Sequence, residues 1–283
     1  MNRNDAFCLK LLRESDRDRY LTVLFAPKKC RGPLASLYAF NVEIAHIAET
    51  VREPMIGEIR LRWWRDAIES SKSGEGNPVL SALLSSIYQY DLPKAAFLRY
   101  CDARVFDLYN DKMPNIASLE GYCGETASAL LQLSCQILDK DAARQTTETT
   151  GHGGVAQALC GILRTLPAIK AKGQHYFPAN MIESNPDDFI QSSQVTAHNQ
   201  EEKLLGAAIA LTRKHYQLFF ESYKDLPKSV WPAFLPLAIV PDALKQIEQK
   251  GIRCFKEYVT PSPIRHYILI AKAGLNGHMP KIS

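Results

Sequence analysis

Apolar residues recur at intervals of three and four along most of this chain, the spacing that places them on one face of an α-helix. The clearest run follows Pro33, and no stretch of useful length alternates apolar and polar residues as a half-buried strand does. The pattern therefore predicts an all-α fold. The stripe after Pro33 consists of Leu34, Leu37, Asn41, Ile44, Ala48 and Val51.

Proline, glycine and capping residues predict where the helices begin and end. Pro54 and Gly57 are expected to mark a turn, Ser73 to Pro78 a linker, and Ser118 the cap of a helix. The glycines of GHGG at 151–154 predict a bend or close packing. Helices are expected at about 34–51, 59–70, 78–88, 94–108, 118–138, up to 164, 199–224, 231–250 and 263–273, and an exposed loop at 170–187.

Composition limits the class of protein. The chain has 283 residues, of which 46% are hydrophobic and 23% charged, as in a globular protein with a sizeable core. A net charge of +4 without a basic stripe or a recognised motif argues against nucleic acid as a partner. No window approaches 18 uninterrupted apolar residues, so we expect at most peripheral membrane contact.

The cysteines and the first residues indicate a compartment. Seven cysteines form no CxxC pair and leave an odd count, which favours buried thiols over a disulfide framework or a zinc site. The first fifteen residues contain two acids and lack the apolar run of a signal peptide. We expect a cytoplasmic protein, at most peripheral to the inner membrane.

Two segments resemble those that carry the aspartate-rich motifs of the squalene/phytoene synthase family. Residues 36–66 read SLYAFNVEIAHIAETVREPMIGEIRLRWWRD, and residues 158–178 read ALCGILRTLPAIKAKGQHYFP. The resemblance implies a single domain over residues 1–283 with the isoprenoid-synthase fold, a helical bundle around a central cavity.

The metal-binding aspartates of those motifs are replaced in this chain. The first motif falls on residues 45–49, where Ala45 takes an Asp position and only Glu49 is acidic; the second places Thr165 and Ile169 at its Asp positions. In the family, Mg²⁺ held there neutralises the leaving diphosphate. Losing one such charge-stabilising group commonly costs about 10² to 10³ in rate. We therefore expect a noncatalytic protein with no catalytic residue, no metal and no cofactor.

The resemblance also implies a vestigial cavity and a partner. Tyr38, Asn41 and Tyr176 are expected to line that cavity together with the four motif positions. The segments DRDRYLTVLFAP at 16–27, HYFP at 175–178 and PAFLPLAIV at 232–240 resemble the noncatalytic branch of the family that includes a mitochondrial complex I assembly factor and its bacterial relatives. This implies a protein partner and a role in respiratory complex I assembly.

Two alternatives stay open at this point. One is a prenyl-diphosphate transferase of the head-to-head type, which would require Mg²⁺. The other is a noncatalytic carrier that holds an isoprenoid or lipid in the cavity. Glu43, His46 and Glu49 have a spacing more typical of a polar helical patch than of a replacement metal site. His152, Cys160 and His175 fit no catalytic triad.

The densest cluster of arginine and tryptophan predicts a partner surface, because these residues commonly anchor protein interfaces. Adjacent residues on a helix point about 100° apart, so two neighbouring tryptophans cannot both point straight into one core. The cluster consists of Arg60, Arg62, Trp63, Trp64 and Arg65.

Overall fold

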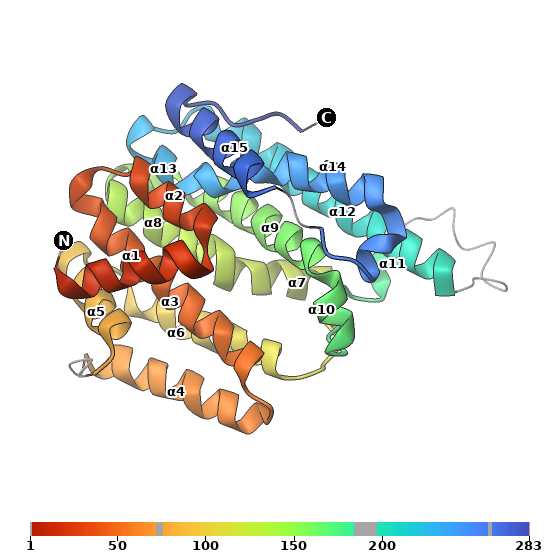
Figure 1. The fold of residues 1–283 in the computed structure, drawn as a ribbon, viewed down its shortest axis with the longest axis horizontal. Helices are drawn as coiled ribbons and strands as arrows, with labels where there is room; N and C mark the ends of the chain where they lie inside the picture. The colour runs from red at the N-terminus through yellow and green to blue at the C-terminus, as the bar shows by residue number, and fades with distance from the viewer. Residues whose placement is uncertain (1, 72–75, 184–196, 260–261, 283) are drawn as a thin grey trace.

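The computed structural model describes residues 2–71, 76–183, 197–259 and 262–282. In these ranges the chain is helical and contains no strand, and an isolated β-bridge joins Lys112 to His175. The all-α prediction is confirmed (Figure 1). The α-helices are α1 (Arg3–Ser15), α2 (Arg17–Phe25), α3 (Arg31–Thr50), α4 (Pro54–Ser70), α5 (Pro78–Tyr90), α6 (Lys94–Ala103), α7 (Ile116–Cys123), α8 (Ala129–Leu138), α9 (Thr147–Arg164), α10 (Leu166–Ala171), α11 (Asn180–Glu183), α12 (Ala197–Tyr223), α13 (Trp231–Phe234), α14 (Val240–Lys250) and α15 (Pro263–Asn276).

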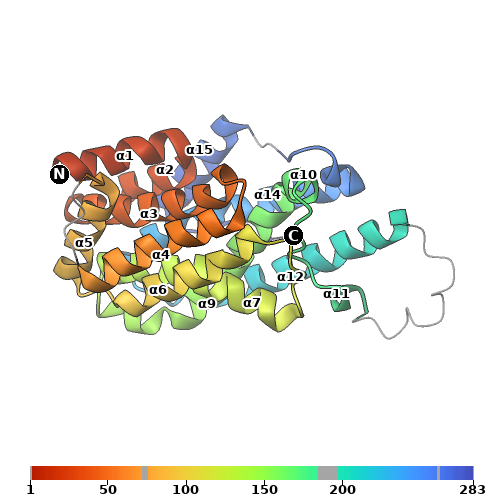
Figure 2. The same cartoon turned by 90° about the horizontal axis from the view of Figure 1, so that it is seen from below.

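Helix α3 is enclosed by other helices over most of its length. It packs against α1, α2, α4, α5 and α8, and every residue from Gly32 to Val42 is buried. A helix enclosed in this way must be apolar on nearly all sides. Its buried Ser36 and Asn41 have hydrogen-bond partners, Ser86 and Tyr100 respectively. In both views of the ribbon α3 lies between α1 and α4 (Figures 1 and 2).

Helix α9 runs straight through the GHGG segment, so the predicted bend is wrong and the predicted close packing is right. A Cβ added at Gly154 would lie 2.2 Å from Ser128 Oγ and 2.3 Å from the backbone of the same residue. The glycine therefore lets α9 approach the neighbouring π-helical segment, Gly124–Ser128, backbone to backbone. The opposite side of α9 packs along α12.

That π-helical segment divides the helix predicted at 118–138 into α7 and α8. The predicted cap at Ser118 is also wrong, because Asn115 Oδ1 accepts the backbone N–H of Ser118 at 2.9 Å. Helix α7 therefore begins at Ile116, directly after its capping asparagine.

Helix α4 begins at Pro54, where we expected a turn. Proline suits the first turn because its missing N–H would have no helical partner there. Gly57 lies inside the helix and contacts Leu108, whose side chain would be 2.4 Å from an added Cβ. Glycine here permits close packing between α4 and the 3₁₀ segment Arg104–Leu108.

The remaining differences between the predicted and the observed helix boundaries are local. Prolines at 232, 236 and 241 divide the predicted 231–250 helix into α13, a 3₁₀ segment at Leu235–Ile239 and α14, because each removes a backbone donor. The 170–187 segment contains the end of α10 and all of α11, while its positions 184–187 lie outside the described residues. Linker positions 73–75 lie outside them too, and Asn77 caps α5.

Two further helices, α1 and α2, precede the first predicted one. Asn2 and Asp5 form a reciprocal capping box at α1, and the Asp16 side chain caps α2. One cluster of buried apolar residues extends from Cys8 in α1 to Met279 beyond α15. No helix within the described ranges is long and apolar enough to span a bilayer.

Candidate functional site

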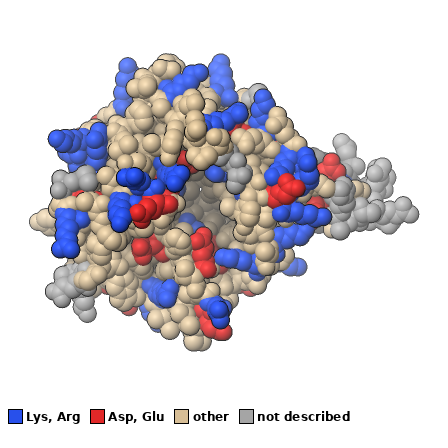
Figure 3. Space-filling view, viewed as in Figure 1, with Lys and Arg blue, Asp and Glu red and all other residues tan. Residues whose placement is uncertain are grey.

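A central cavity of about 460 Å³ opens among the helices of the bundle. Figure 3 shows a hollow near the middle of one face, with acidic and basic side chains around it. Residues of α2, α3, α9 and α10, the 3₁₀ segment after α6 and the segment after α10 line the cavity. Its charged lining residues are Asp16, Asp18, Arg19, Glu49, Arg104, Asp107, Arg164 and Lys172.

The two motif segments meet at this cavity. Ala45, Ala48 and Glu49 line it from α3, while the second segment contributes residues from α9 and α10. At Ala45, Thr165 and Ile169 the lining consists of a methyl group, a threonine hydroxyl and an isoleucine side chain. The residues of the second segment in the lining are Ala158, Cys160, Gly161, Ile162, Arg164, Thr165, Ala168, Ile169, Lys172, Gln174 and Tyr176.

Asp107 is the centre of a hydrogen-bond network in the wall of the cavity. Its carboxylate accepts hydrogen bonds from Arg104 Nη1 at 2.9 Å and from the hydroxyls of Tyr122 and Tyr176, each at 2.7 Å. Gln174 Nε2 donates to the Asp107 carbonyl at 2.7 Å. Burial, reinforced by the nearby Asp107 charge, raises the pKa of Tyr176 well above its ordinary value.

Arg104 connects this network to α3, the helix that carries Asn41. Its Nη2 donates to the Tyr100 hydroxyl at 2.9 Å, and that hydroxyl donates to Asn41 Oδ1 at 2.7 Å. Burial lowers the pKa of Arg104, but the phenol groups of Tyr100 and Tyr122 and the Asp107 carboxylate together raise it well above its ordinary value. The guanidinium thus stays charged, and its donors are directed at neighbouring protein groups.

The other acidic groups of the cavity also have basic partners. Asp16 accepts from Arg19 Nη1 at 2.6 Å, and the Asp18 carboxylate lies 3.0 Å from Nδ1 of His266. Glu49 Oε2 lies 3.2 Å from Nε2 of His46, one turn earlier on α3. Together with Asp107 and Arg104, these pairs engage all four carboxylates of the described lining.

Two basic groups of the cavity lining, Arg164 and Lys172, are less well matched by hydrogen-bond partners than its carboxylates. Among the residues that the structure describes, Nε of Arg164 is buried and has no hydrogen-bond partner, and Lys172 Nζ donates a long contact, 3.4 Å, to the Ala48 carbonyl. An unsatisfied charged donor is costly inside a protein, so the Arg164 guanidinium is less well stabilised by neighbouring groups than that of Arg104.

Of the seven predicted cavity residues, Tyr38 does not line the cavity. It is buried behind Arg19, which lies over its ring at 5.6 Å, and its hydroxyl is 3.0 Å from Ser134 Oγ. Burial raises the pKa of Tyr38 to about 12. The lining includes the other six: Asn41, Ala45, Glu49, Thr165, Ile169 and Tyr176.

Sequence reasoning missed most of the polar network. Asp16 and Arg19 lie in the quoted segment DRDRYLTVLFAP, where the alternating charges were a usable sign of an internal ion pair. Arg104, Asp107 and Tyr122 lie in segments that carry no recognised motif, and their contacts join residues up to 69 positions apart.

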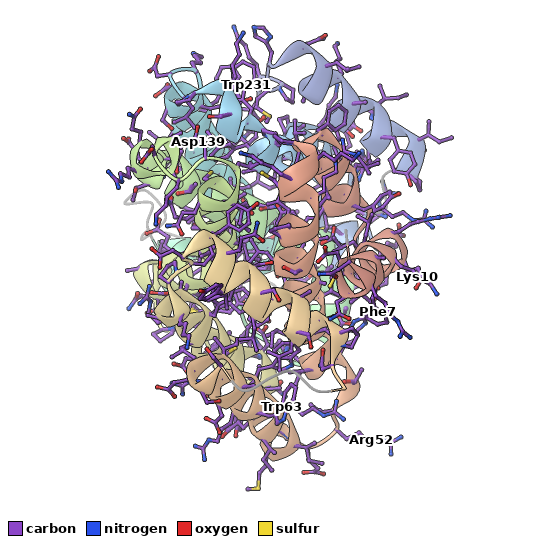
Figure 4. The ribbon with its side chains drawn as sticks, turned by 90° about the vertical axis from the view of Figure 1, so that its left-hand side faces the viewer. Phe7, Lys10, Arg52, Trp63, Asp139 and Trp231 are labelled. Carbon is purple, nitrogen blue, oxygen red and sulfur yellow. The ribbon has the colours of Figure 1, made fainter. Side chains whose placement is uncertain are left out.

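On α4 the two tryptophans separate as their 100° offset predicts. Trp64 is 4% exposed and packs edge-on against Phe40 at 5.5 Å, whereas Trp63 is 49% exposed. The predicted partner surface is thus corrected at Trp64, which belongs to the core, while Arg65 forms an ion pair with Asp102 on α6 at 3.0 Å. Figure 4 shows Trp63 at the end of the molecule formed by α4.

The exposed side chains of α4 surround a shallow groove between α3 and α4. The groove is lined by Glu43, His46, Ile47, Thr50, Ile59, Arg60, Trp63 and Trp64. We call a set of six exposed residues of the helix the α4 surface: Met55, Ile56, Ile59, Arg60, Arg62 and Trp63.

The cysteines, of which Cys160 lines the cavity, and a pair of histidines are two further groups of reactive side chains. All seven cysteines are buried and unbridged, and burial raises the pKa of Cys160 to about 11, which keeps the thiol protonated. His152 and His215 meet at 3.0 Å between their Nδ1 atoms, and His215 Nε2 lies 3.0 Å from Glu120. In the described part of the chain no three His, Cys, Asp or Glu residues are grouped to hold a metal ion.

Comparison with known proteins identifies the class. The family model for squalene/phytoene synthase matches residues 12–265, and the chain belongs to that family. Solved structures show the same fold: a dehydrosqualene synthase at 17% identity, covering 97% of each chain with a TM-score of 0.76. The squalene synthase HpnC from Alicyclobacillus acidocaldarius, at 18% identity, covers 88% of this chain and 94% of its own, with a TM-score of 0.69.

Curated relatives divide into two groups. A Rattus norvegicus protein named NADH dehydrogenase (ubiquinone) complex I, assembly factor 6 is 30% identical over 255 residues, which is 88% of this chain and 75% of that protein. A presqualene diphosphate synthase from Rhodopseudomonas palustris is 27% identical over 164 residues, 58% of each chain. The longer similarity is to the assembly factors.

Proposed function

We propose that this protein is a noncatalytic member of the family that acts by binding a protein partner during assembly of respiratory complex I. The observation that carries the proposal is the similarity to assembly factor 6 over nearly nine tenths of the chain. The fold is shared with the synthases and does not distinguish the two roles.

The chemistry of the cavity supports the noncatalytic part. Mg²⁺ takes oxygen ligands, above all carboxylates, and releases its water reluctantly. At the motif positions Ala45, Thr165 and Ile169 supply no carboxylate, and the four carboxylates of the lining already contact Arg19, Arg104, His46 and His266. Mg²⁺ ions would therefore have to share these carboxylates with the basic side chains that already contact them.

The proposed lack of synthase activity is tested directly with purified protein. Incubation with farnesyl or geranylgeranyl diphosphate, Mg²⁺ and a reductant is expected to yield no presqualene diphosphate, squalene or phytoene above a no-enzyme control. Product formation would show that the chain is a transferase of the head-to-head type and overturn this part. The same samples, extracted with organic solvent, also reveal whether the cavity holds an isoprenoid or lipid.

The assembly part is tested in cells. Deletion of the gene should lower the amount of assembled complex I on a native gel, and the wild-type gene should restore it. Because aromatic and arginine side chains anchor interfaces, the α4 surface is our proposed contact for the partner. Restoration is expected to fail with Arg62→Glu combined with Trp63→Ser, which removes an exposed cation and an exposed ring.

A matched control uses the neighbouring arginine. Arg65→Gln breaks a partly exposed ion pair with Asp102 inside the molecule and leaves the α4 surface intact, so it should restore complex I. Full restoration of complex I by the Arg62 and Trp63 double variant would show that the partner binds a face other than the α4 surface. An unchanged level of complex I after gene deletion would reject the assembly role itself.

A further inference from the structure

Helix α15 has one side packed into the protein and one side directed outward. His266, Ile270 and Ala273 form its buried side. His266 contacts Asp18 at the start of α2, and a Cβ on Gly274 would meet the ring of Phe25 at the end of α2. The two helices therefore run side by side in the same direction at the outside of the bundle (Figures 1 and 2).

The outward side of α15 is apolar over three turns. Ile264, Ile268 and Leu275 are 68%, 59% and 79% exposed, and their spacing of four and seven residues puts them on one line. Tyr267 is exposed beside this line. An outward stripe of large aliphatic side chains is the reverse of the usual surface helix and marks an interaction site. We call Ile264, Tyr267, Ile268 and Leu275 the α15 face.

Helix α15 and the segment after it carry basic charges only, and the two acids that contact the helix come from α2 and α14. The chain from Pro263 to Ile282 contains Arg265, Lys272 and Lys281 and no Asp or Glu. The two carboxylates bonded to α15 are already matched, Asp18 by His266 and Asp242 by Arg265.

The neighbouring helix adds to this charge. Arg17 and Leu24 on α2 are exposed, and each is next in sequence to a residue that contacts α15, Asp18 and Phe25 respectively. In Figure 3 the region over α15 shows lysine and arginine side chains among uncharged ones. The face is thus an apolar line bordered by cations.

We propose that the α15 face docks on an anionic lipid bilayer, with α15 lying in the plane of the membrane surface. Ile264, Ile268 and Leu275 enter the boundary between headgroups and acyl chains, and Lys272 and Arg17 meet the lipid phosphates. A bilayer fits better than a protein groove, because lipid phosphates are mobile and can meet the cations in any arrangement. A protein groove would need acidic groups at matching positions. The proposal is independent of the assembly role, which can hold whether or not the protein binds lipid.

Vesicle flotation tests the proposal with the full chain. The wild-type protein is expected to float with phosphatidylcholine vesicles that contain phosphatidylglycerol, and to bind weakly to phosphatidylcholine alone. The triple variant Ile264→Ser, Ile268→Ser, Leu275→Ser should lower the partition coefficient by about tenfold or more, since apolar burial drives insertion. Lys272→Glu should lower it by about threefold to tenfold on the anionic vesicles only, because one cation near the surface is reversed.

The matched control removes the same kind of side chain elsewhere. Met55→Ser, Ile56→Ser, Ile59→Ser deletes three exposed apolar residues of α4 and should leave vesicle binding within about twofold, because the α15 face is intact. All substituted residues are exposed, and a thermal melt confirms that each variant is folded.

Three results would overturn the proposal. The first is a wild-type protein that does not float with anionic vesicles. The second is an equal loss of binding in the α4 control, which would indicate nonspecific adsorption. The third is a triple variant that binds vesicles normally but changes from dimer to monomer on a sizing column, which would show that a second copy of the chain covers the α15 face.

Discussion

The central cavity and the α4 surface use the same residue types in opposite ways. In the cavity, Arg19 and Arg104 are held by carboxylates and hydroxyls of the protein itself. On α4, Arg62 and Trp63 face solvent. Polar groups that already have internal partners contribute to stability, whereas exposed aromatic and cationic groups remain available for recognition. The comparison predicts large stability effects in the cavity wall and functional effects with little change in stability on α4.

The largest expected effect is at Asp107. Asp107→Ala removes the carboxylate that receives Arg104, Tyr122 and Tyr176, and leaves a largely buried guanidinium without its counterion. Breaking a buried pair in this way costs about 3 to 5 kcal/mol, to be measured by urea denaturation followed by circular dichroism.

Asp102→Ala is the control for this prediction. It breaks the pair with Arg65, whose side chains are 39% and 50% exposed, and should cost no more than about 1 kcal/mol. Equal losses in the two variants would show that the cavity network contributes no more than a surface ion pair.

The second effect concerns the contact of α9 with the π-helical segment. Gly154→Ala places a methyl group within 2.3 Å of the Ser128 backbone, which cannot move as a flexible side chain does. We expect a loss of about 1 to 3 kcal/mol or more in unfolding free energy. Gly151→Ala, on the same helix with open space around its Cβ position, should instead stabilise the protein by about 0.5 to 1 kcal/mol. Similar values for both would mean that α9 does not approach Ser128 closely.

A smaller effect should appear with pH at the pair of histidines between α9 and α12. Burial lowers the pKa of His215, although its contact with Glu120 opposes the shift. As pH falls, the unfolded chain therefore binds this proton before the folded one does, so stability decreases below about pH 6.5 and levels off below the folded pKa.

Unfolding free energies measured between neutral and mildly acidic pH would check this expectation. The decrease should be shallower in His215→Gln, which cannot take up the proton, while His278→Gln at an exposed position should follow the wild type. A slope unaffected by His215→Gln would assign the pH dependence to other groups.

How much the sequence could predict differs between these regions. Spacing alone identified the helices around α3 and the offset of Trp63 and Trp64, because burial of a helix is periodic. The resemblance placed six of its seven positions at the cavity. It failed for Tyr38, since alignment gives a helical face but cannot show that Arg19 from α2 lies between that ring and the cavity.

The hydrogen-bond network around Asp107 could not be predicted from the sequence for a related reason. Its partners come from three separate segments, and each tyrosine or arginine alone is an ordinary residue. Similarly, the π-helical segment before α8 packs against Gly154 of α9, a contact that local propensity does not encode.

The smallest expected stability effect is at Glu49, the acid that remains at the first motif. Its side chain is 59% exposed and its partner His46 is on the same helix, so Glu49→Ala should change the unfolding free energy by no more than about 0.5 kcal/mol. In a protein that retained the metal chemistry the same change would remove a ligand and abolish function. We expect Glu49→Ala to restore complex I in the deletion strain as well as the wild type does, whereas the Arg62 and Trp63 double variant fails. If Glu49→Ala fails with its stability unchanged, the cavity still carries a function through Glu49 and its neighbours Glu43 and His46, and the contrast between the cavity and the α4 surface is wrong.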